Sequence, residues 1–317
     1  MNLDYLHNHA EFKSLLEILE SEKGINASLI EKDYWIMHVL YSLKKLGYEF
    51  ELKGGTSLSK GFGIINRFSE DIDIHIKPPD ALNINENPNN ESKKNLDTRK
   101  KFYDKLAEEI KIEGIISINR DEEFDSHNYL SGGIRLSYDA KIPSIEGSKE
   151  GILLEVGFDT VTPNIPRTIS SWAYDKASSN LGDVFIDNRA KDILCYHPGY
   201  TFVEKLQTII RKFRKEQETG IRNKNFLRHY SDVSDLLNNP IVNEFIGTEE
   251  YEGHKLKRIN GKDSEVSISS NEAFLLNDKE LLEELKKRFL ETKNLYYKGQ
   301  PNFEEIINNI KTNLPRL

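Results

Sequence analysis

Two strand-like stretches, separated by a glycine pair and a short helix, constrain the fold of this chain most strongly. Residues 48–53 alternate polar and apolar side chains, and so do residues 71–76, as in strands with one buried face. The sequence Gly-Gly-Thr-Ser at 54–57 interrupts the first stretch and can cap a helix that we expect to end near Ile65. The chain therefore predicts a strand, a tight turn, a short helix and a second strand.

The second of these strands begins with two aspartates, Asp71 and Asp73. Residues two apart in a strand point to the same face, with Cα atoms about 6.6 Å apart. Two such carboxylates repel, and burial would neutralise one of them unless a cation lies between them. Magnesium prefers a few carboxylate oxygens together with phosphate oxygens of a substrate. A lone Asp-x-Asp is common on exposed strands, but at this place it predicts a magnesium site.

The turn before the short helix has features that favour binding of a triphosphate. Gly54 and Gly55 let the backbone approach the phosphates closely. The N-terminus of the following helix presents free N–H groups and a partial positive charge. Thr56 and Ser57 add hydroxyl donors. A lone Gly-Gly-Thr is a weak signal, but its order with the aspartates makes the combined pattern specific.

The remaining sequence predicts a mixed first half and a helical second half. Residues 78–95 are rich in proline and asparagine and predict a loop insertion. After Pro163 the apolar residues follow helical spacing. We therefore expect an α+β fold, with a small mixed or antiparallel sheet and flanking helices in residues 1–165 and a mostly helical C-terminal domain in residues 166–317. The main expected helices and strands are residues 11–46, 98–111, 115–119, 133–139, 152–158 and 201–215.

The charge of the chain is unevenly distributed. A net charge of -8 argues against binding to nucleic acid through bulk attraction. Between Thr201 and Arg228, however, basic residues outnumber acidic ones. A solvated helix face often has this composition, so the run alone does not establish a binding surface. Its candidate RNA contacts are Arg211, Lys212, Arg214 and Lys215.

Composition also limits the compartment. Cys195 is the single cysteine, which excludes a disulfide framework and a thiolate zinc cluster. No stretch approaches the roughly 18 consecutive apolar residues that a membrane span needs. The first residues lack the basic and apolar regions of a secretory signal. We expect a cytoplasmic protein without membrane contact.

Several segments carry a resemblance to a known family. Leu52–Leu58 and Arg67–Asp73 resemble the motifs of the AbiEii/AbiGii-type nucleotidyltransferase toxins, within the DNA polymerase β-like superfamily. Glu31–Trp35 resembles the segment before the first of these motifs. Lys205 and the Arg228–Asp232 segment resemble the last motif, a lysine followed by an arginine–aspartate helix.

The resemblance implies a polymerase β-like nucleotidyltransferase domain and assigns roles to individual residues. Residues 54–57 would hold the triphosphate, with Arg67 and Ser69 leading into the two metal-binding aspartates. Lys205 would neutralise phosphate charge, and Asp232 would lie near the nucleotide or position Lys205. These assignments would bring residues of the C-terminal domain into the catalytic site.

The superfamily usually has a third carboxylate on a neighbouring strand. Glu155 is the favoured candidate as a further catalytic and metal-binding residue, because its apolar flanks would make an unpaired charge costly. Asp159, just past the expected end of that strand, is the competitor.

The resulting hypothesis is a magnesium-dependent transfer of a nucleoside monophosphate from an NTP to an acceptor hydroxyl. The family includes toxins restrained by a cognate antitoxin, so we expect one half of a bacterial toxin–antitoxin or abortive-infection pair that acts in phage defence. The 3′ end of tRNA is the expected acceptor. Two alternatives remain open: transfer to a small molecule or protein, and a non-catalytic module that binds a nucleotide or partner.

Overall fold

The computed structural model describes residues 3–145, 149–159, 161–182, 184–223 and 225–317. These residues form two compact units. The first, which we call the sheet unit, consists of the described residues of Met1–Phe62 and Ser69–Tyr196. The second, the helical unit, consists of Gly63–Phe68 and the described residues of His197–Leu317.

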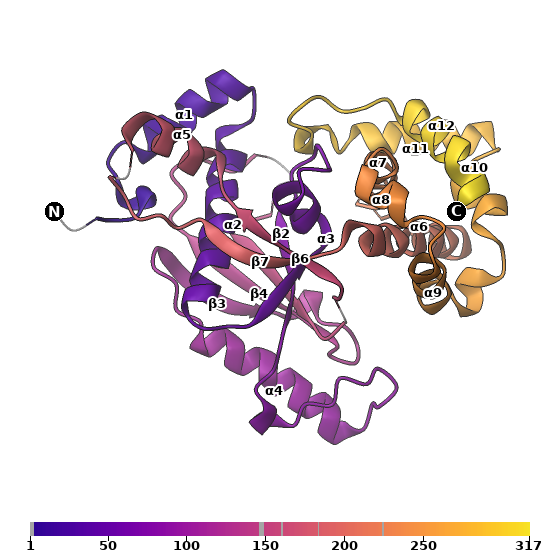
Figure 1. Ribbon diagram of the computed structural model, residues 1–317, viewed down its shortest axis with the longest axis horizontal. Coiled ribbons are helices and arrows are strands. Elements are labelled where there is room, and N and C mark those ends of the chain that lie inside the picture. The colour runs from indigo at the N-terminus through magenta and orange to yellow at the C-terminus, as the bar shows by residue number, and fades with distance from the viewer. Residues whose placement is uncertain (1–2, 146–148, 160, 183, 224) are drawn as a thin grey trace. The chain divides into compact units, whose positions relative to one another are not determined.

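A mixed seven-stranded sheet organises the described part of the sheet unit, in the order β3-β4-β5-β2-β1-β7-β6 (Figure 1). The pairs β2–β5 and β1–β7 are parallel, and the other neighbouring pairs are antiparallel. This arrangement confirms the expected α+β class, with a larger sheet than the sequence predicts. The strands are β1 (Phe50–Lys53), β2 (Asp71–Ile76), β3 (Ile115–Asp121), β4 (Ser131–Tyr138), β5 (Ile152–Gly157), β6 (Asn164–Ile169) and β7 (Ala190–Tyr196).

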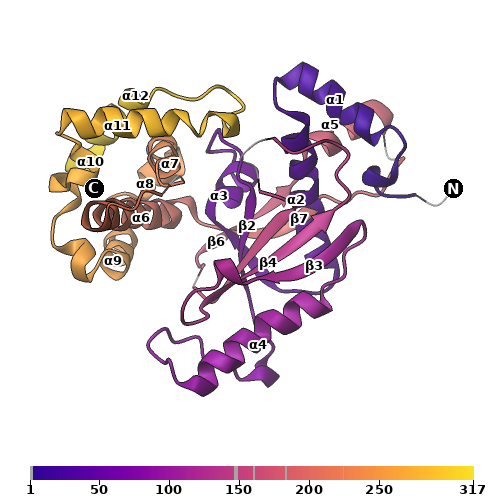
Figure 2. The same cartoon turned by 180° about the vertical axis from the view of Figure 1, so that it is seen from behind.

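Helices pack on this sheet in the same unit. Figures 1 and 2 show α4 running along β3 and β4. Its Tyr103 ring lies where a Cβ on Gly132 would be, so glycine at that strand position makes room for the aromatic ring. The helix α2 is buried along most of its length, including the charged residues Glu31, Lys32 and Asp33. The helices of this unit are α1 (Phe12–Lys23), α2 (Ala27–Lys45), α3 (Gly54–Thr56), α4 (Lys93–Glu109) and α5 (Trp172–Leu181).

The division between the units lies further along the chain than the expected one at residue 165. Residue 165 falls inside β6, and both β6 and β7 belong to the same sheet as β1. Pro163 and Pro166 suggested a break, but β6 lies at an edge of the sheet, where a strand tolerates proline because one side of its backbone needs no partner. The compact units divide after Tyr196 instead.

The helical unit is built around the amphipathic helix α6, as its sequence predicts. Phe202, Leu206 and Ile209 of this helix are fully buried. The segment Gly63–Phe68 joins the same unit, where the Phe68 amide donates to the Leu295 carbonyl at 2.7 Å. Its helices are α6 (Pro198–Thr219), α7 (Arg228–Leu237), α8 (Pro240–Phe245), α9 (Glu249–Arg258), α10 (Glu272–Leu275), α11 (Lys279–Leu290) and α12 (Phe303–Asn313).

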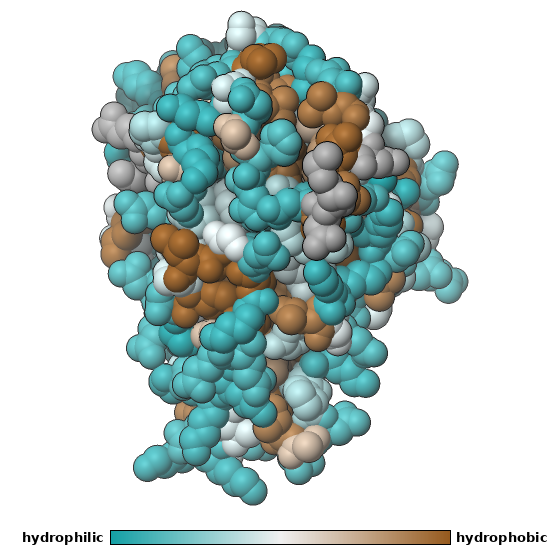
Figure 3. All heavy atoms as spheres, turned by 90° about the vertical axis from the view of Figure 1, so that its left-hand side faces the viewer, coloured by the Kyte–Doolittle hydropathy of each residue, from teal (hydrophilic) through white to brown (hydrophobic). Residues whose placement is uncertain are grey.

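The surface mixes polar and apolar side chains. On the face in Figure 3, apolar residues form separate areas among hydrophilic ones. Ile116, on the edge strand β3, is 70% exposed and is among the most exposed large apolar side chains of the described residues. No helix within the described ranges is long and apolar enough to cross a membrane.

Candidate active site

The turn between β1 and α3 requires glycine at its first position. Gly54 has φ +70°, in the left-handed region that other residues rarely adopt. A Cβ at this position would also collide with the carboxylate of Asp73. The helix that starts here ends sooner than expected, because α3 continues only into a π-helical turn over Ser57–Gly61. Gly54 thus brings the backbone of the turn directly against one of the two strand aspartates.

Strand pairing places three carboxylates on one face of the sheet. Asp71 and Asp73 alternate in β2 with the buried residues Ile72 and Ile74. In the parallel β2–β5 pair, Asp73 lies in register with Glu155. Neighbouring strands are about 4.8 Å apart, so the two side chains adjoin. The competitor Asp159 is exposed and lies beyond the end of β5.

The electrostatics of Glu155 reflect this crowding. Burial, together with the charges of Asp73 and Asp71, raises its pKa to about 8, whereas Lys149 and Lys53 oppose the shift. Near neutral pH this carboxyl therefore holds a proton in much of the population. A nearby cation would favour its ionised form.

The described residues hold no ready-made group of three or more His, Cys, Asp or Glu side chains suited to a metal ion. Within the carboxylate face, Asp71 Oδ2 accepts a hydrogen bond from the Lys149 ammonium at 2.7 Å. Asp71 Oδ1 is buried without a hydrogen-bond partner in the described structure. One oxygen of this candidate ligand thus already meets a positive charge, and the other is buried and unsatisfied.

The hydroxyls of the turn point into the fold. Thr56 Oγ1 donates to the backbone carbonyl of Asp71 and ties the turn to the start of β2. Ser57 is fully buried beside Cys195, whose pKa burial raises to about 11. The Thr56 hydroxyl therefore supports the turn and the Ser57 hydroxyl is buried, whereas the sequence predicts that both are donors to a triphosphate. Ser69 is also buried in this unit.

The charged residues of α2 hold segments around the site. Glu31 accepts hydrogen bonds from the backbone amides of Lys141 and Ile142. Asp33 pairs with Lys60, in the turn after α3, at 2.7 Å, and it accepts from the Trp172 amide. A run of three consecutive charges next to the apolar residues of this helix is the sequence signal that could have identified these anchors.

Lys32, which lies between Glu31 and Asp33 in α2, holds a further segment near the site. Its ammonium lies 3.2 Å from Glu70 Oε1 and also donates to the Lys149 carbonyl. The same Glu70 oxygen accepts from the Lys149 amide at 3.1 Å. Lys149 was missed by the sequence analysis, because it lies in an irregular segment with no periodic pattern.

In the helical unit, Asp232 joins two cations. The Arg67 guanidinium donates to both of its carboxylate oxygens, at 2.7 Å each, and the Lys205 ammonium donates at 2.6 Å. All three side chains are buried. Although burial opposes the shift, the charges of Arg67 and Lys205 hold the pKa of Asp232 well below its usual range. Asp232 therefore fixes the position of the Lys205 ammonium, and Arg67 belongs to this cluster.

The four candidate RNA contacts on α6 differ in their surroundings. Arg211 and Lys215 are exposed. Arg214 is half-buried and pairs with Asp263 at 2.8 Å. Lys212 is half-buried, with its ammonium 3.3 Å from His229 Nε2. Two of the four positive charges are thus open to solvent, and two make contacts inside the unit.

A comparison with protein families matches residues 37–309 to the family described as nucleotidyl transferase AbiEii toxin, type IV TA system. The chain belongs to this family. The match confirms the resemblance read from the sequence motifs and places the chain in the nucleotidyltransferase superfamily. Enzymes of this superfamily generally use divalent metals. A type IV toxin–antitoxin family implies an antitoxin partner and an NTP substrate.

Two solved structures match this chain at low identity. One is the crystal structure of JHP933 from Helicobacter pylori, with a TM-score of 0.41 and 16% identity, over 89% of this chain and 89% of that chain. The other is an antigenic nucleotidyltransferase-like protein from Paracoccidioides brasiliensis, with a TM-score of 0.36 and 12% identity, over 81% of this chain and 93% of that chain. No curated protein matches this chain.

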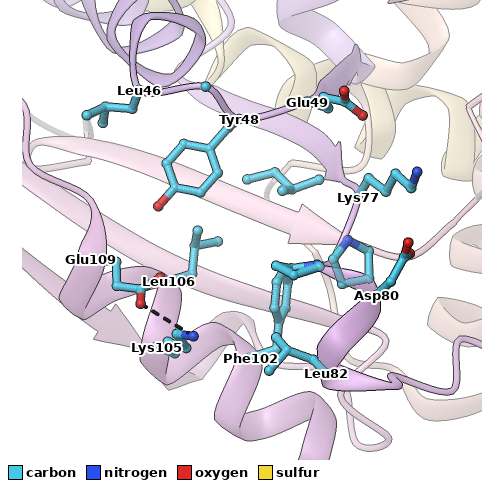
Figure 4. A pocket seen from close by; sticks show the side chains of 14 residues that line it. Leu46, Tyr48, Glu49, Lys77, Asp80, Leu82, Phe102, Lys105, Leu106 and Glu109 are labelled. Carbon is cyan, nitrogen blue, oxygen red and sulfur yellow. Dashed lines mark ion pairs between the residues drawn. The ribbon is translucent and has the colours of Figure 1, made fainter.

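A cavity of about 460 Å³ is lined by none of the carboxylates Asp71, Asp73 and Glu155. Figure 4 shows the Tyr48 and Phe102 rings on its two sides and the Lys105–Glu109 ion pair at its margin. Its lining includes residues that precede β1 and follow β2, so it occupies the end of this antiparallel pair opposite to Gly54. The cavity and the carboxylate face are therefore separate features of the sheet unit.

Proposed function

We propose that this protein transfers a nucleoside monophosphate from an NTP to an acceptor hydroxyl, with magnesium held by Asp71, Asp73 and Glu155. The observation that carries the proposal is the row of three carboxylates beside the Gly54 turn. All donors are carboxylate oxygens, which suit magnesium. The buried, unsatisfied Asp71 Oδ1 and the repulsion felt by Glu155 are both relieved by a cation at this face.

Magnesium bound there would neutralise phosphate charge and lower the pKa of the acceptor hydroxyl. The acceptor oxygen attacks the α-phosphorus, the bond from that phosphorus to the α–β bridging oxygen breaks, and pyrophosphate leaves. In this proposal the hydroxyl proton passes to Glu155. The backbone at Gly54 and Gly55 approaches the triphosphate, because neither residue has a side chain that would hold it away. Lys205, fixed by Asp232, neutralises phosphate charge.

We propose tRNA, at its 3′ end, as the acceptor, with the protein acting as the toxin of an anti-phage toxin–antitoxin pair. The exposed Arg211 and Lys215 support this acceptor, since phosphate contacts need only a local basic patch. The competing acceptors, a small molecule or another protein, need no such patch.

Transfer from each of four labelled NTPs to total RNA, in magnesium, tests the reaction and its acceptor together. We expect label in a tRNA-sized band, and we expect Asp71→Asn and Asp73→Asn to abolish labelling while the thermal melting temperature stays close to that of the wild type. Activity that persists when both aspartates are replaced in one protein would refute the metal site. Label in a small molecule or in protein would replace the tRNA acceptor and leave the transferase chemistry intact. A wild type that binds NTP without transferring it to any acceptor would leave only the non-catalytic binding module.

A further inference from the structure

Lys149 places a positive charge directly on Asp71, one of the proposed metal ligands. Its ammonium lies 2.7 Å from Asp71 Oδ2 and 5.0 Å from the centre of the Phe124 ring. Its charge also acts on Glu155, across the carboxylate face from Asp71. If Asp71 binds magnesium, as proposed above, the ion and this ammonium compete for the same carboxylate.

The backbone of Lys149 is fixed, whereas its side chain has room to move. The amide donates to Glu70, and the carbonyl accepts from the buried Lys32 ammonium. The Lys149 side chain itself is 26% exposed. A lysine has four rotatable methylene carbons and a compact charge, so its ammonium can change partner while the main chain stays in place. If a nucleotide binds at this face, its phosphate oxygens are among the hydrogen-bond acceptors available to the Lys149 ammonium.

We propose that Lys149 is a substrate-binding cation, which neutralises Asp71 in the free protein and transfers its hydrogen bond to an NTP phosphate when the metal takes Asp71. This inference rests on the proposed function and adds a residue to it. The exchange keeps charges paired in both states: lysine with aspartate before binding, and metal with aspartate and lysine with phosphate afterwards. No covalent bond changes.

Metal binding without nucleotide gives a readout that does not depend on activity. Mn²⁺, which favours the same oxygen ligands as magnesium, is titrated into the protein and the free ion is measured by electron paramagnetic resonance. We expect Lys149→Met to bind Mn²⁺ about threefold or more tightly than the wild type, because the competing ammonium is gone. Lys141→Met is the matched control. The Lys141 ammonium pairs with the exposed Asp139, so the Lys141→Met substitution should leave the Mn²⁺ affinity unchanged.

Nucleotide binding tests the second half of the exchange. With Mn²⁺ at saturation, the four non-hydrolysable α,β-imido NTPs are titrated and the tightest is compared among variants. Lys149→Met should weaken binding about tenfold or more, the loss expected for one charge-assisted hydrogen bond. Lys149→Arg, which keeps the charge, should recover part of it, and thermal melting confirms that each variant is folded.

Opposite outcomes separate this inference from the function that it rests on. Unchanged Mn²⁺ affinity in Lys149→Met, or unchanged nucleotide affinity, would overturn the role of Lys149 while Asp71→Asn still abolishes transfer. If the wild type bound no Mn²⁺ and transferred no nucleotide, the proposed function would fail, and this inference with it. Tighter Mn²⁺ binding together with weaker nucleotide binding, in the Lys149 variant alone, supports the exchange.

Discussion

Removing the Asp232 carboxylate should destabilise the helical unit strongly. In Asp232→Asn, an amide replaces the carboxylate that contacts both the buried Arg67 and the buried Lys205 charge. The Asp232 side chain is 0% exposed, so solvent does not reach the two cations where they contact this carboxylate. Breaking a buried ion pair by removing one partner costs about 3 to 5 kcal/mol, because the remaining charge stays desolvated. We expect a loss of that size in the free energy of unfolding.

Asp235 provides a matched control one turn along the same helix. Its carboxylate accepts only a long hydrogen bond, 3.4 Å, from the Asn66 amide, and burial raises its pKa to about 6. Asp235→Asn should therefore change stability by less than about 1 kcal/mol. Urea unfolding, followed by circular dichroism at a helical wavelength, compares the two variants with the wild type.

The pH dependence sharpens this test. Because the pKa of Asp232 is lowered in the folded state, its stabilisation is present above the pKa of the unfolded chain and is lost only as the pH falls through the lower folded value. The cost of Asp232→Asn should thus be similar at about pH 5 and about pH 8. Equal costs for Asp232→Asn and Asp235→Asn, or a cost that disappears by about pH 5, would refute the buried-triad reasoning.

Three further predictions concern the turn, the third carboxylate and the basic helix. Gly54→Ala should abolish transfer and lower the free energy of unfolding by about 1 to 3 kcal/mol. Gly63 also has a positive φ but open space around it, so Gly63→Ala should keep activity. Turnover and thermal melting measure both variants. Glu155→Gln should stabilise the metal-free protein relative to the wild type. The difference should grow by about 2 to 4 kcal/mol between about pH 5 and about pH 8, because the raised pKa of Glu155 makes the wild type less stable as the pH rises over that range. Denaturant titrations at the two pH values check this, and a difference that shrinks would contradict it. Reversing the charges of Arg211 and Lys215 should raise the apparent KM for tRNA and reduce its salt dependence by about one unit of slope per lost contact, with NTP affinity unchanged.

The strand, turn and second strand could be predicted from sequence because the signals are local. Alternation in β2 and the left-handed glycine at Gly54 each depend on a few consecutive residues. The partner of Asp73 could not be predicted in this way, since it depends on the register of a parallel pair with a strand far along the chain. Glu155 was suggested by family resemblance instead. β6 was missed for a related reason, because only the sheet order shows that Pro166 lies in an edge strand.

The surroundings of the carboxylates depend on pairings that no local pattern contains. Glu31, Lys32 and Asp33 are consecutive in α2, yet their partners come from distant segments of the sheet unit. Each of the three is buried, so an exchange of partners would leave a desolvated charge unpaired and cost several kcal/mol. This cost favours one arrangement of the segments that carry Lys60 and Lys149. The same helix therefore holds the turn after α3 and the backbone of the lysine on Asp71, so charges outside the carboxylate face position part of its surroundings.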